Sequence, residues 1–337
     1  MTEQSAKSAV PIRSLRRSHI GSLVFCGMSL FLFLLLLRNA EFAIGHMSDG
    51  LRLCVRTVIP SLFPFMVLSE LLTLAGAAEL VGRLLPRPLR RLFGVSRDGA
   101  CAVLLGLVCG FPIGAKSAAA LYRSGRVDRS ELCHLLTFSN TPSSAFLISA
   151  VGLSLFGSRA FGTRLYVITL VSALLTGLVG ARWQARKSEH APSFPRQKEK
   201  KPLTAPRRKG MIACFTDAIT SSALAILSVC AFVVFFSAFV GTVESMLQSL
   251  SLPSTVKALC YGFFELTGGT ARAAACAPPA AEYLCAFLAG WSGLSVHCQI
   301  MSLCADTDVS FRPYLLAKLA QGLLNLLLLF LANIILP

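Results

Sequence analysis

The sequence predicts an all-α integral membrane protein built from inverted repeats of membrane spans and re-entrant hairpins. Of its 337 residues 54% are apolar and only 14% are charged, which is too little charge for the surface of a soluble domain of this size. Several apolar runs approach the ~20 residues that a helix needs to cross a bilayer. Two similar interruptions, Gly110-Phe-Pro-Ile-Gly-Ala-Lys116 and Gly268-Gly-Thr-Ala-Arg272, fall inside apolar segments of the two halves. Paired interruptions of this kind are typical of secondary transporters.

Residues 1–19 are predicted to be a cytoplasmic N-terminal tail, and residues 20–50 a first span with the loop that follows it. The apolar run Ile20–Leu37 comes after three arginines, as the apolar region of a signal peptide does. The run is long for a signal peptide, and it ends at Arg38 without a small-residue cleavage site. We therefore expect an uncleaved membrane span.

Residues 51–181 form the first predicted repeat. After a long span, Leu51–Ala75, the break at Gly110 divides the segment Gly99–Tyr122 into two arms of ~17 Å, and neither arm can cross a hydrocarbon core of ~30 Å. Arginines flank this segment on both sides and favour the cytoplasm, so the segment is expected to enter and return as a hairpin. Two further spans complete the repeat: Leu132–Phe156, broken at residues 139–144, and Phe161–Ala181.

Residues 211–337 form the second predicted repeat, after a basic and proline-rich linker over residues 182–210. Clustered lysine and arginine place this linker in the cytoplasm, and we expect no nucleic-acid partner for it. Because one span precedes the first repeat, the two repeats are expected to face opposite ways across the membrane. The segments of the second repeat are the span Ala218–Val243, the hairpin Lys257–Ala275, the span Leu284–Cys304 with its break at Gly290–Gly293, and the span Pro313–Leu336.

Lys116 and Arg272 follow the two hairpin breaks and are the strongest candidates for substrate binding. An ionisable group inside a membrane segment is costly and marks a functional site by default. Free N–H groups and the positive end of a helix at each break also favour an anion. We therefore expect both side chains to face one shared cavity that holds a small anion. The alternatives are that they reach the membrane surface or pair with Glu70 or Glu265, two carboxylates that could otherwise bind a coupling proton or sodium ion.

Polar residues at the other breaks complete the predicted site. The predicted substrate-binding residues are Gly110, Phe111, Pro112, Gly114, Lys116, Asn140, Thr141, Ser143, Glu265, Thr267, Gly268, Gly269, Thr270, Arg272, Ser292, Ser295, His297 and Gln299. The side chains at residues 140–144 could instead satisfy backbone groups freed by Pro142, and His297 is either a proton carrier or a structural hydrogen-bonding group. Asp306 and Asp308 look like a metal pair, but their place before a helix start favours a capping role.

The sequence carries no signature of catalysis or of metal or cofactor binding. Its twelve cysteines show no CxxC pair and no metal-ligand spacing. It also contains neither a nucleophile elbow nor an H-E-x-x-H motif. We therefore expect that the protein is not an enzyme and that it has no cofactor or metal site.

Six short motifs occur along the predicted repeats: Leu62-Phe-Pro-Phe65, Gly110-Phe-Pro-Ile-Gly-Ala-Lys116, Phe138-Ser-Asn-Thr141, Gly262-Phe-Phe-Glu-Leu-Thr267, Gly293-Leu-Ser-Val-His-Cys-Gln299 and Asp306-Thr-Asp308. Together they resemble the sporulation integral membrane protein family of the YlbJ (SpoVV) type. The resemblance covers about Leu51–Ala181 and Ala218 to the C-terminus. It implies two nucleoside-recognition (Gate) domains of the kind found in nucleoside transporters. It also implies a role in spore formation, moving dipicolinate, a planar aromatic dianion, out of the mother cell across the outer forespore membrane.

The favoured function is therefore that of a multi-pass membrane protein that transports a small organic anion, as a secondary transporter or a facilitator. A nucleoside or nucleobase carrier is one alternative, although Lys116 and Arg272 argue against a neutral cargo. A membrane scaffold for sporulation is the other, although a scaffold needs no paired broken segments with buried cations. The anionic substrate and the lipid bilayer are the expected partners, and the sequence leaves open whether the chain forms a homo-oligomer.

Overall fold

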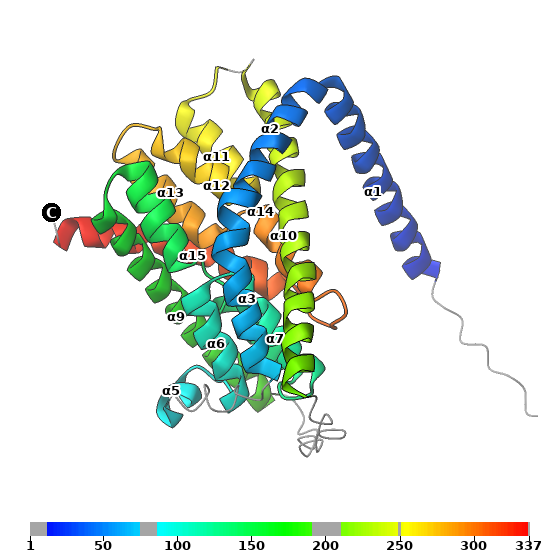
Figure 1. Ribbon diagram of the computed structural model, residues 1–337, viewed down its shortest axis with the longest axis vertical. Helices are drawn as coiled ribbons and strands as arrows, with labels where there is room; N and C mark the ends of the chain where they lie inside the picture. The colour runs from blue at the N-terminus through cyan, green and yellow to red at the C-terminus, as the bar shows by residue number, and fades with distance from the viewer. Residues whose placement is uncertain (1–11, 75–85, 191–209, 249–250, 336–337) are drawn as a thin grey trace, which may run out of the picture.

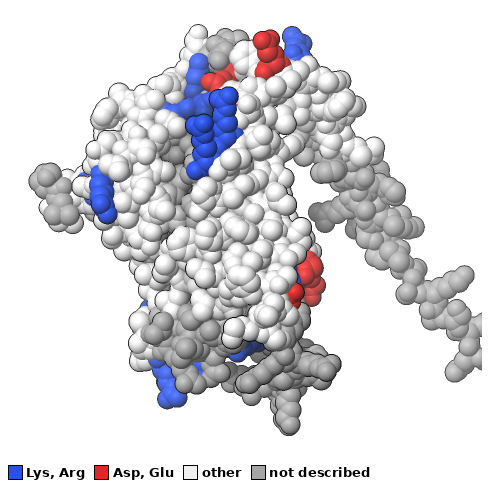
Figure 2. All heavy atoms as spheres, viewed as in Figure 1, with Lys and Arg blue, Asp and Glu red and all other residues white. Residues whose placement is uncertain are grey.

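The computed structural model describes residues 12–74, 86–190, 210–248 and 251–335, and within these ranges its regular elements are all helices (Figure 1). Four of these helical segments are long and apolar enough to cross a membrane, and a bent pair near the N-terminus makes a fifth candidate. On the face drawn in Figure 2, most charged side chains lie toward the top and the bottom, two smaller charged groups lie at the left and right edges between them, and the centre of the face is uncharged, as suits a hydrocarbon environment. The predicted all-α membrane fold is confirmed.

The N-terminal helix leans away from the helical body and bends sharply into the helix that follows it (Figure 1). The first elements are α1 (Ile12–Arg38), α2 (Ala40–Leu53), the π-helical turn η1 (Cys54–Val58) and α3 (Ile59–Leu74). The axes of α1 and α2 differ by 95°. From α2 to α3 the chain runs on without a non-helical residue, so these three elements form one long helix.

This long helix begins at Ala40, and the predicted start of the second span at Leu51 is wrong. The error has a physical cause. Polar residues such as Glu41 and Asp49 lie in the first turns of the helix, and they interrupt the apolar run by which a span is recognised in a sequence. The prolines predicted to lie inside the span are there, since Pro64 is within α3.

The helix α10, Met211–Gln248, lies against α2 and α3 and runs in the opposite direction (Figure 1). Near the C-terminal end of α10, Ser245 donates a hydrogen bond of 2.9 Å to Asn39 at the start of α2. In its N-terminal half, Ser221 donates one of 3.4 Å to Glu70 of α3. The long helices that open the two halves are therefore antiparallel, as inverted repeats require.

The rest of the first half follows the predicted order of hairpin, broken helix and continuous helix. Its elements are α5 (Arg87–Leu92), α6 (Arg97–Cys109), α7 (Ile113–Arg123), α8 (Arg129–Phe138), the π-helix η2 (Ala145–Leu155) and α9 (Arg159–His190). The hairpin of α6 and α7 turns at Gly110, whose φ of 80° favours glycine. Its two arms approach closely because Gly106 of α6 faces Gly114 of α7. The break between α8 and η2 lies at residues 139–143, as predicted.

The second half repeats this order after α10. Its elements are α11 (Ser254–Phe264), α12 (Leu266–Ala274), α13 (Ala280–Trp291), α14 (Leu294–Leu303) and α15 (Arg312–Ile335). The hairpin consists of α11 and α12, the broken helix of α13 and α14, and the continuous helix of α15. The break between α13 and α14 is at Ser292 and Gly293, which both have positive φ values, 73° and 82°.

The second hairpin breaks at Glu265, and the predicted break at residues 268–270 is wrong because these residues lie within α12. Glu265 has an extended backbone, with φ −138° and ψ 122°. Its carboxylate accepts hydrogen bonds from the N–H groups of Thr267 (2.9 Å) and Gly268 (2.5 Å). A carboxylate that caps the positive end of a helix stabilises it, so Glu265 itself starts α12.

The two halves share one hydrophobic core. Buried Leu135 and Phe138 of α8 belong to the same apolar cluster as Val296 and Ile300 of α14. A second cluster joins Leu165 of α9 to residues of α13 and α15. The interruptions of both halves are consequently held against each other inside a single packed body.

Residues 191–209 of the predicted linker lie outside the described residues, and α9 extends the preceding span to His190. We expect this linker to be cytoplasmic, because lysine and arginine clusters stay on that side. A Ser188→Cys variant, at the linker end of α9, should therefore resist an impermeant thiol reagent in intact cells and react after the cells are opened. Labelling in intact cells above the background of the endogenous cysteines would show that the linker lies outside the cell and that the predicted topology is wrong.

Candidate substrate cavity

The interruptions of the two halves surround a cavity of about 380 Å³. Eight of the predicted substrate-binding residues line it: Phe111, Pro112, Ser143, Glu265, Thr267, Thr270, Ser295 and Gln299. The remaining wall is largely apolar and includes Val229 and Val233 from the middle of α10. Both hairpins and both broken helices thus contribute to one site.

Local contacts hold each hairpin tip against a broken helix. In the first half the N–H of Phe111 donates to the carbonyl oxygen of Thr141 at 2.8 Å, which joins the tip of the α6–α7 hairpin to the α8–η2 break. In the second half, a Cβ atom on Gly293 would lie 3.0 Å from the backbone nitrogen of Leu266. Glycine at this position therefore lets the α13–α14 break touch the tip of the α11–α12 hairpin.

The cavity wall carries a carboxylate but no described cation. Glu265 is the charged side chain among the lining residues that the structure describes, and its negative charge is compensated by the backbone N–H groups at the start of α12. The other polar groups are hydroxyls and the amide of Gln299, whose Nε2 donates to the Ser295 hydroxyl at 3.3 Å. The cavity thus combines apolar surface with a few neutral hydrogen-bonding groups, as small-molecule sites usually do.

Lys116 of α7 is turned away from the cavity and paired with a carboxylate. Its Nζ lies 3.2 Å from Oε2 of Glu70 in α3 and donates to the Ser222 hydroxyl of α10 at 3.1 Å. The side chains of Lys116 and Glu70 are only 10% and 15% exposed. The pairing of Lys116 with Glu70, which the sequence left open as an alternative to substrate binding, is therefore present.

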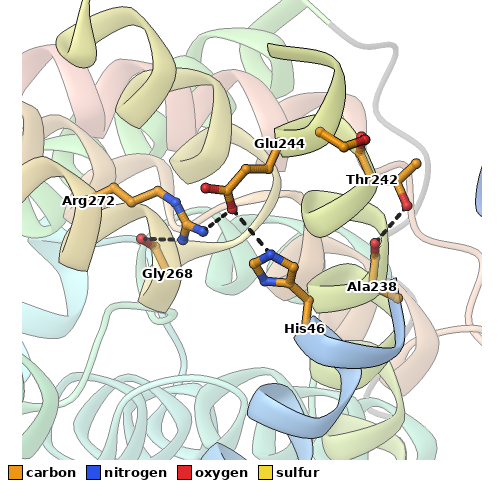
Figure 3. Close-up of polar contacts among 7 residues, drawn as sticks. His46, Ala238, Thr242, Glu244, Gly268 and Arg272 are labelled. Atoms are coloured by element: carbon orange, nitrogen blue, oxygen red, sulfur yellow. Dashed lines mark hydrogen bonds and ion pairs between the residues drawn. The ribbon is translucent and has the colours of Figure 1, made fainter. Parts of the chain in front are cut away.

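Arg272 of α12 is paired with Glu244 of α10, not with Glu265 (Figure 3). The Arg272 Nη2 lies 2.5 Å from Oε2 of Glu244, and the same oxygen is 3.3 Å from the His46 ring of α2. The guanidinium also stacks over Tyr261, 4.0 Å from the ring centroid. Figure 3 shows Glu244 between the arginine and the histidine.

The two ion pairs are far apart, so the prediction that Lys116 and Arg272 face one shared cavity is wrong. Ser222, which binds Lys116, and Glu244, which binds Arg272, lie on the same straight helix and are separated along it by roughly 33 Å at about 1.5 Å per residue. Each cation pairs with a carboxylate from another helix, Glu70 for Lys116 and Glu244 for Arg272. Glu244 was not predicted as a partner from the sequence. Its signal was an ionisable residue near the end of an apolar run.

Lys318 of α15 is a buried cation that the sequence reasoning missed. It is 0% exposed, and its Nζ donates to the carbonyl oxygen of Asn140 and, at 2.8 Å, to Oε1 of Gln321. Its position inside a predicted membrane span was the available signal. Gln321 in turn donates to the carbonyl oxygen of Thr137 at 2.9 Å. Two side chains of α15, Lys318 and Gln321, therefore donate hydrogen bonds to the backbone at and just after the C-terminal end of α8.

The other predicted residues do not line the cavity, and all of them except the half-buried Gly268 are buried. These are Gly110, Gly114, Asn140, Thr141, Gly268, Gly269, Ser292 and His297. Asn140 donates to the carbonyl oxygen of Leu136 at 3.1 Å, and His297 Nδ1 lies 2.8 Å from the Tyr314 hydroxyl. Asn140 Oδ1, Thr141 Oγ1 and His297 Nε2 are buried and have no hydrogen-bond partner among the described residues.

Asp306 pairs with an arginine through its carboxylate, and Asp308 accepts a hydrogen bond from another arginine through its backbone carbonyl. Both carboxylate oxygens of Asp306 accept hydrogen bonds from Arg123, at 2.6 and 2.7 Å, and this guanidinium lowers the pKa of the Asp306 carboxyl. The carbonyl oxygen of Asp308 accepts one from Arg129 at 2.7 Å. Over the residues that the structure describes, no group of three or more metal-ligating side chains occurs.

Comparison with known proteins supplies the family. The chain is 30% identical, over 339 aligned positions, to the sporulation integral membrane protein YlbJ of Bacillus subtilis (strain 168), and the alignment covers 90% of this chain and 81% of that protein. The chain belongs to the YlbJ family. It is therefore a multi-pass integral membrane protein related to a sporulation protein. No protein-family model and no solved structure matches the chain, so the two Gate domains stay a prediction.

Proposed function

We propose that this YlbJ relative moves a small organic anion across a membrane, as a secondary transporter or a facilitator. The observation that carries the proposal is the convergence of both hairpin tips and both broken helices on one cavity. Backbone that leaves the helical state at membrane depth must be buried in protein or line a wet cavity. Interruptions that meet between two antiparallel halves are the arrangement in which transporters bind their cargo.

The size of the cavity fits a small solute, since sites for small molecules span roughly 300–1,000 Å³ and this one has about 380 Å³. The ends of the helices favour a negative charge in it. Among the lining residues, Pro112, Ala145, Leu266 and Ser295 lie at or beside the first residues of α7, η2, α12 and α14, and N-terminal helix ends carry free N–H groups and a partial positive charge. Side chains already occupy two of these ends, the carboxylate of Glu265 at α12 and the hydroxyl of Ser143 at η2.

The identity of the cargo comes from the family resemblance. The transported anion would be dipicolinate, and the protein would act in the outer forespore membrane. Dipicolinate is flat and aromatic, and the rings of Phe111 and Phe146 line the cavity. A coupling proton or sodium ion and a homo-oligomeric state belong to the same proposal and are open to measurement.

A nucleoside or nucleobase carrier is the second candidate, and one observation favours it. The charged group described in the cavity wall is a carboxylate, and the neutral groups beside it, Thr267, Thr270 and Gln299, can bind the hydroxyls and edges of a neutral cargo. Lys116 and Arg272, which argued against a neutral cargo, are engaged in ion pairs outside the cavity.

Uptake of labelled dipicolinate and labelled uridine into proteoliposomes, with and without a proton gradient, tests these functions. The wild type should take up dipicolinate, and an Ala271→Trp variant should not, because Ala271 lines the cavity and an indole would fill it. A Leu327→Trp variant is the matched control, since Leu327 is 52% exposed on α15.

Uptake of uridine without dipicolinate would establish the second candidate. If folded wild-type protein moved neither compound, the protein would not be the proposed carrier, and a scaffold role in sporulation would replace it. Unchanged uptake by the Ala271→Trp variant would show that the transported compound does not bind in this cavity.

A further inference from the structure

The break between α8 and η2 exposes carbonyl oxygens in the interior of the protein. An α-helix that ends leaves its last carbonyl groups without N–H partners, and this end carries a partial negative charge. Asn140, the second residue after the end of α8, is 0% exposed, so its backbone is shielded from bulk solvent. A cation is the natural partner for oxygen atoms in such a position.

Lys318 supplies that cation from a helix of the other half. Its ammonium group donates to the Asn140 carbonyl oxygen and to Gln321 Oε1. No carboxylate among the residues that the structure describes forms an ion pair with it; Lys116, in contrast, is paired with Glu70. A fully buried lysine without an acidic partner is costly, and here oxygen dipoles take the place of a counter-ion.

Further oxygen atoms at the same break have no partner among the residues that the structure describes. Asn140 Oδ1 and Thr141 Oγ1 are buried and make no hydrogen bond there, and both residues are 0% exposed. The ammonium group contacts one backbone carbonyl and one amide oxygen, and with the amide oxygen and the hydroxyl left unpartnered at the break these are the types of oxygen that a hard cation takes. Transporters bind coupling cations with unwound backbone carbonyls and the C-terminal ends of broken helices.

We propose that the break between α8 and η2 is a cation-binding site that the ammonium group of Lys318 fills in place of a free metal ion. The lysine thereby ties the broken helix of the first half to the last helix of the second half. The protein needs no sodium at this position, and removal of the ammonium converts the site into one for sodium. This inference goes beyond the proposed function and does not depend on which cargo the cavity holds.

Thermal unfolding of the purified protein in equal concentrations of sodium, potassium and choline chloride tests the proposal. The wild type should unfold at the same temperature in all three salts. Lys318→Ala leaves the oxygen ligands and opens space, so its unfolding temperature should be low in choline and rise in sodium. A cation that binds only the folded state stabilises it by mass action. Lys318→Gln, which is neutral and shorter than lysine, should respond to sodium in the same direction.

Two controls separate a specific site from a general salt effect. Lys318→Met keeps an apolar chain in the space of the lysine, so it should be destabilised and should not respond to sodium. Adding Thr141→Val to Lys318→Ala removes one ligand and should weaken the response. Absence of a sodium effect in both Lys318→Ala and Lys318→Gln, or failure of both to fold in sodium, overturns the proposal. A sodium response of the wild type that is lost on Thr141→Val would also overturn it.

Discussion

Replacing Lys116 by glutamine is expected to destabilise the protein by ~3–5 kcal/mol, the usual cost of removing one partner of a buried ion pair. The Nζ of Lys116 lies 3.2 Å from Glu70, and both side chains are largely shielded from solvent. Without the lysine, the Glu70 carboxyl group would lose its cationic partner and keep only Ser221 as a hydrogen-bonding neighbour. The double variant Lys116→Gln with Glu70→Gln should recover most of the loss, because it leaves no charge unpaired.

Thermal unfolding of the four proteins in this cycle measures the effect. Lys116→Arg should be milder than Lys116→Gln because it keeps the charge. Arg272→Gln is the matched comparison in the other half, and it should cost only ~1 kcal/mol or less, since the paired side chains of Arg272 and Glu244 are 30% and 24% exposed. If Lys116→Gln unfolded at the wild-type temperature, the pair would not be the buried link described here.

Gly106→Ala is expected to disrupt the first hairpin. A Cβ atom at Gly106 would collide with the carbonyl oxygen of Ser139 and lie 3.0 Å from the Cα of Gly114. Both obstacles are backbone atoms, which cannot rotate aside as a side chain does. Inserting even one methyl group into a packed interior typically costs 1–3 kcal/mol and at times more. The hairpin would have to move away from the α8–η2 break, and the Phe111 to Thr141 hydrogen bond would be lost.

Gly45→Ala is the matched control for Gly106→Ala. Gly45 lies on α2 with nothing within 4 Å of the new Cβ atom, and alanine is favoured over glycine in a helix by up to ~1 kcal/mol. Unfolding temperature and dipicolinate uptake should both fall for Gly106→Ala and remain at or above wild type for Gly45→Ala. Equal behaviour of the two variants would show that the hairpin is not packed as tightly as its glycines indicate.

The membrane class and the order of segments could be predicted because they depend on local signals. Apolar runs mark spans, and Gly110 with the following Phe-Pro marks a turn that the structure contains. The same reasoning misplaced the second hairpin tip. Gly268 and Gly269 look like a break, but Gly269 faces the backbone of Gly262 in the neighbouring arm and so permits close packing within the hairpin. The helix is interrupted at Glu265 alone, whose backbone is extended. No local sequence pattern distinguishes this glutamate from one inside a helix.

The electrostatic part of the site could not be predicted because pairing between distant segments is a property of the fold. Lys116 and Arg272 occupy similar sequence contexts, which favoured a common role in one cavity. In the structure each meets a carboxylate from another helix, Glu70 or Glu244. Lys318 lies in an apolar run that predicts a membrane span, and no local pattern around it indicates its partners.

The helix α10 contacts both ion pairs, through Ser222 about a third of the way along it and through Glu244 near its C-terminal end. Ser222 and Glu244 are about six turns apart and differ by only roughly 40° around the helix axis, so they lie on nearly the same side of it. A tilt of ~10° about the point midway between them moves each by roughly 3 Å in opposite directions. That displacement is about one hydrogen-bond length. If α10 tilts as a rigid rod, tightening the contact with Lys116 loosens the contact with Arg272, and the reverse.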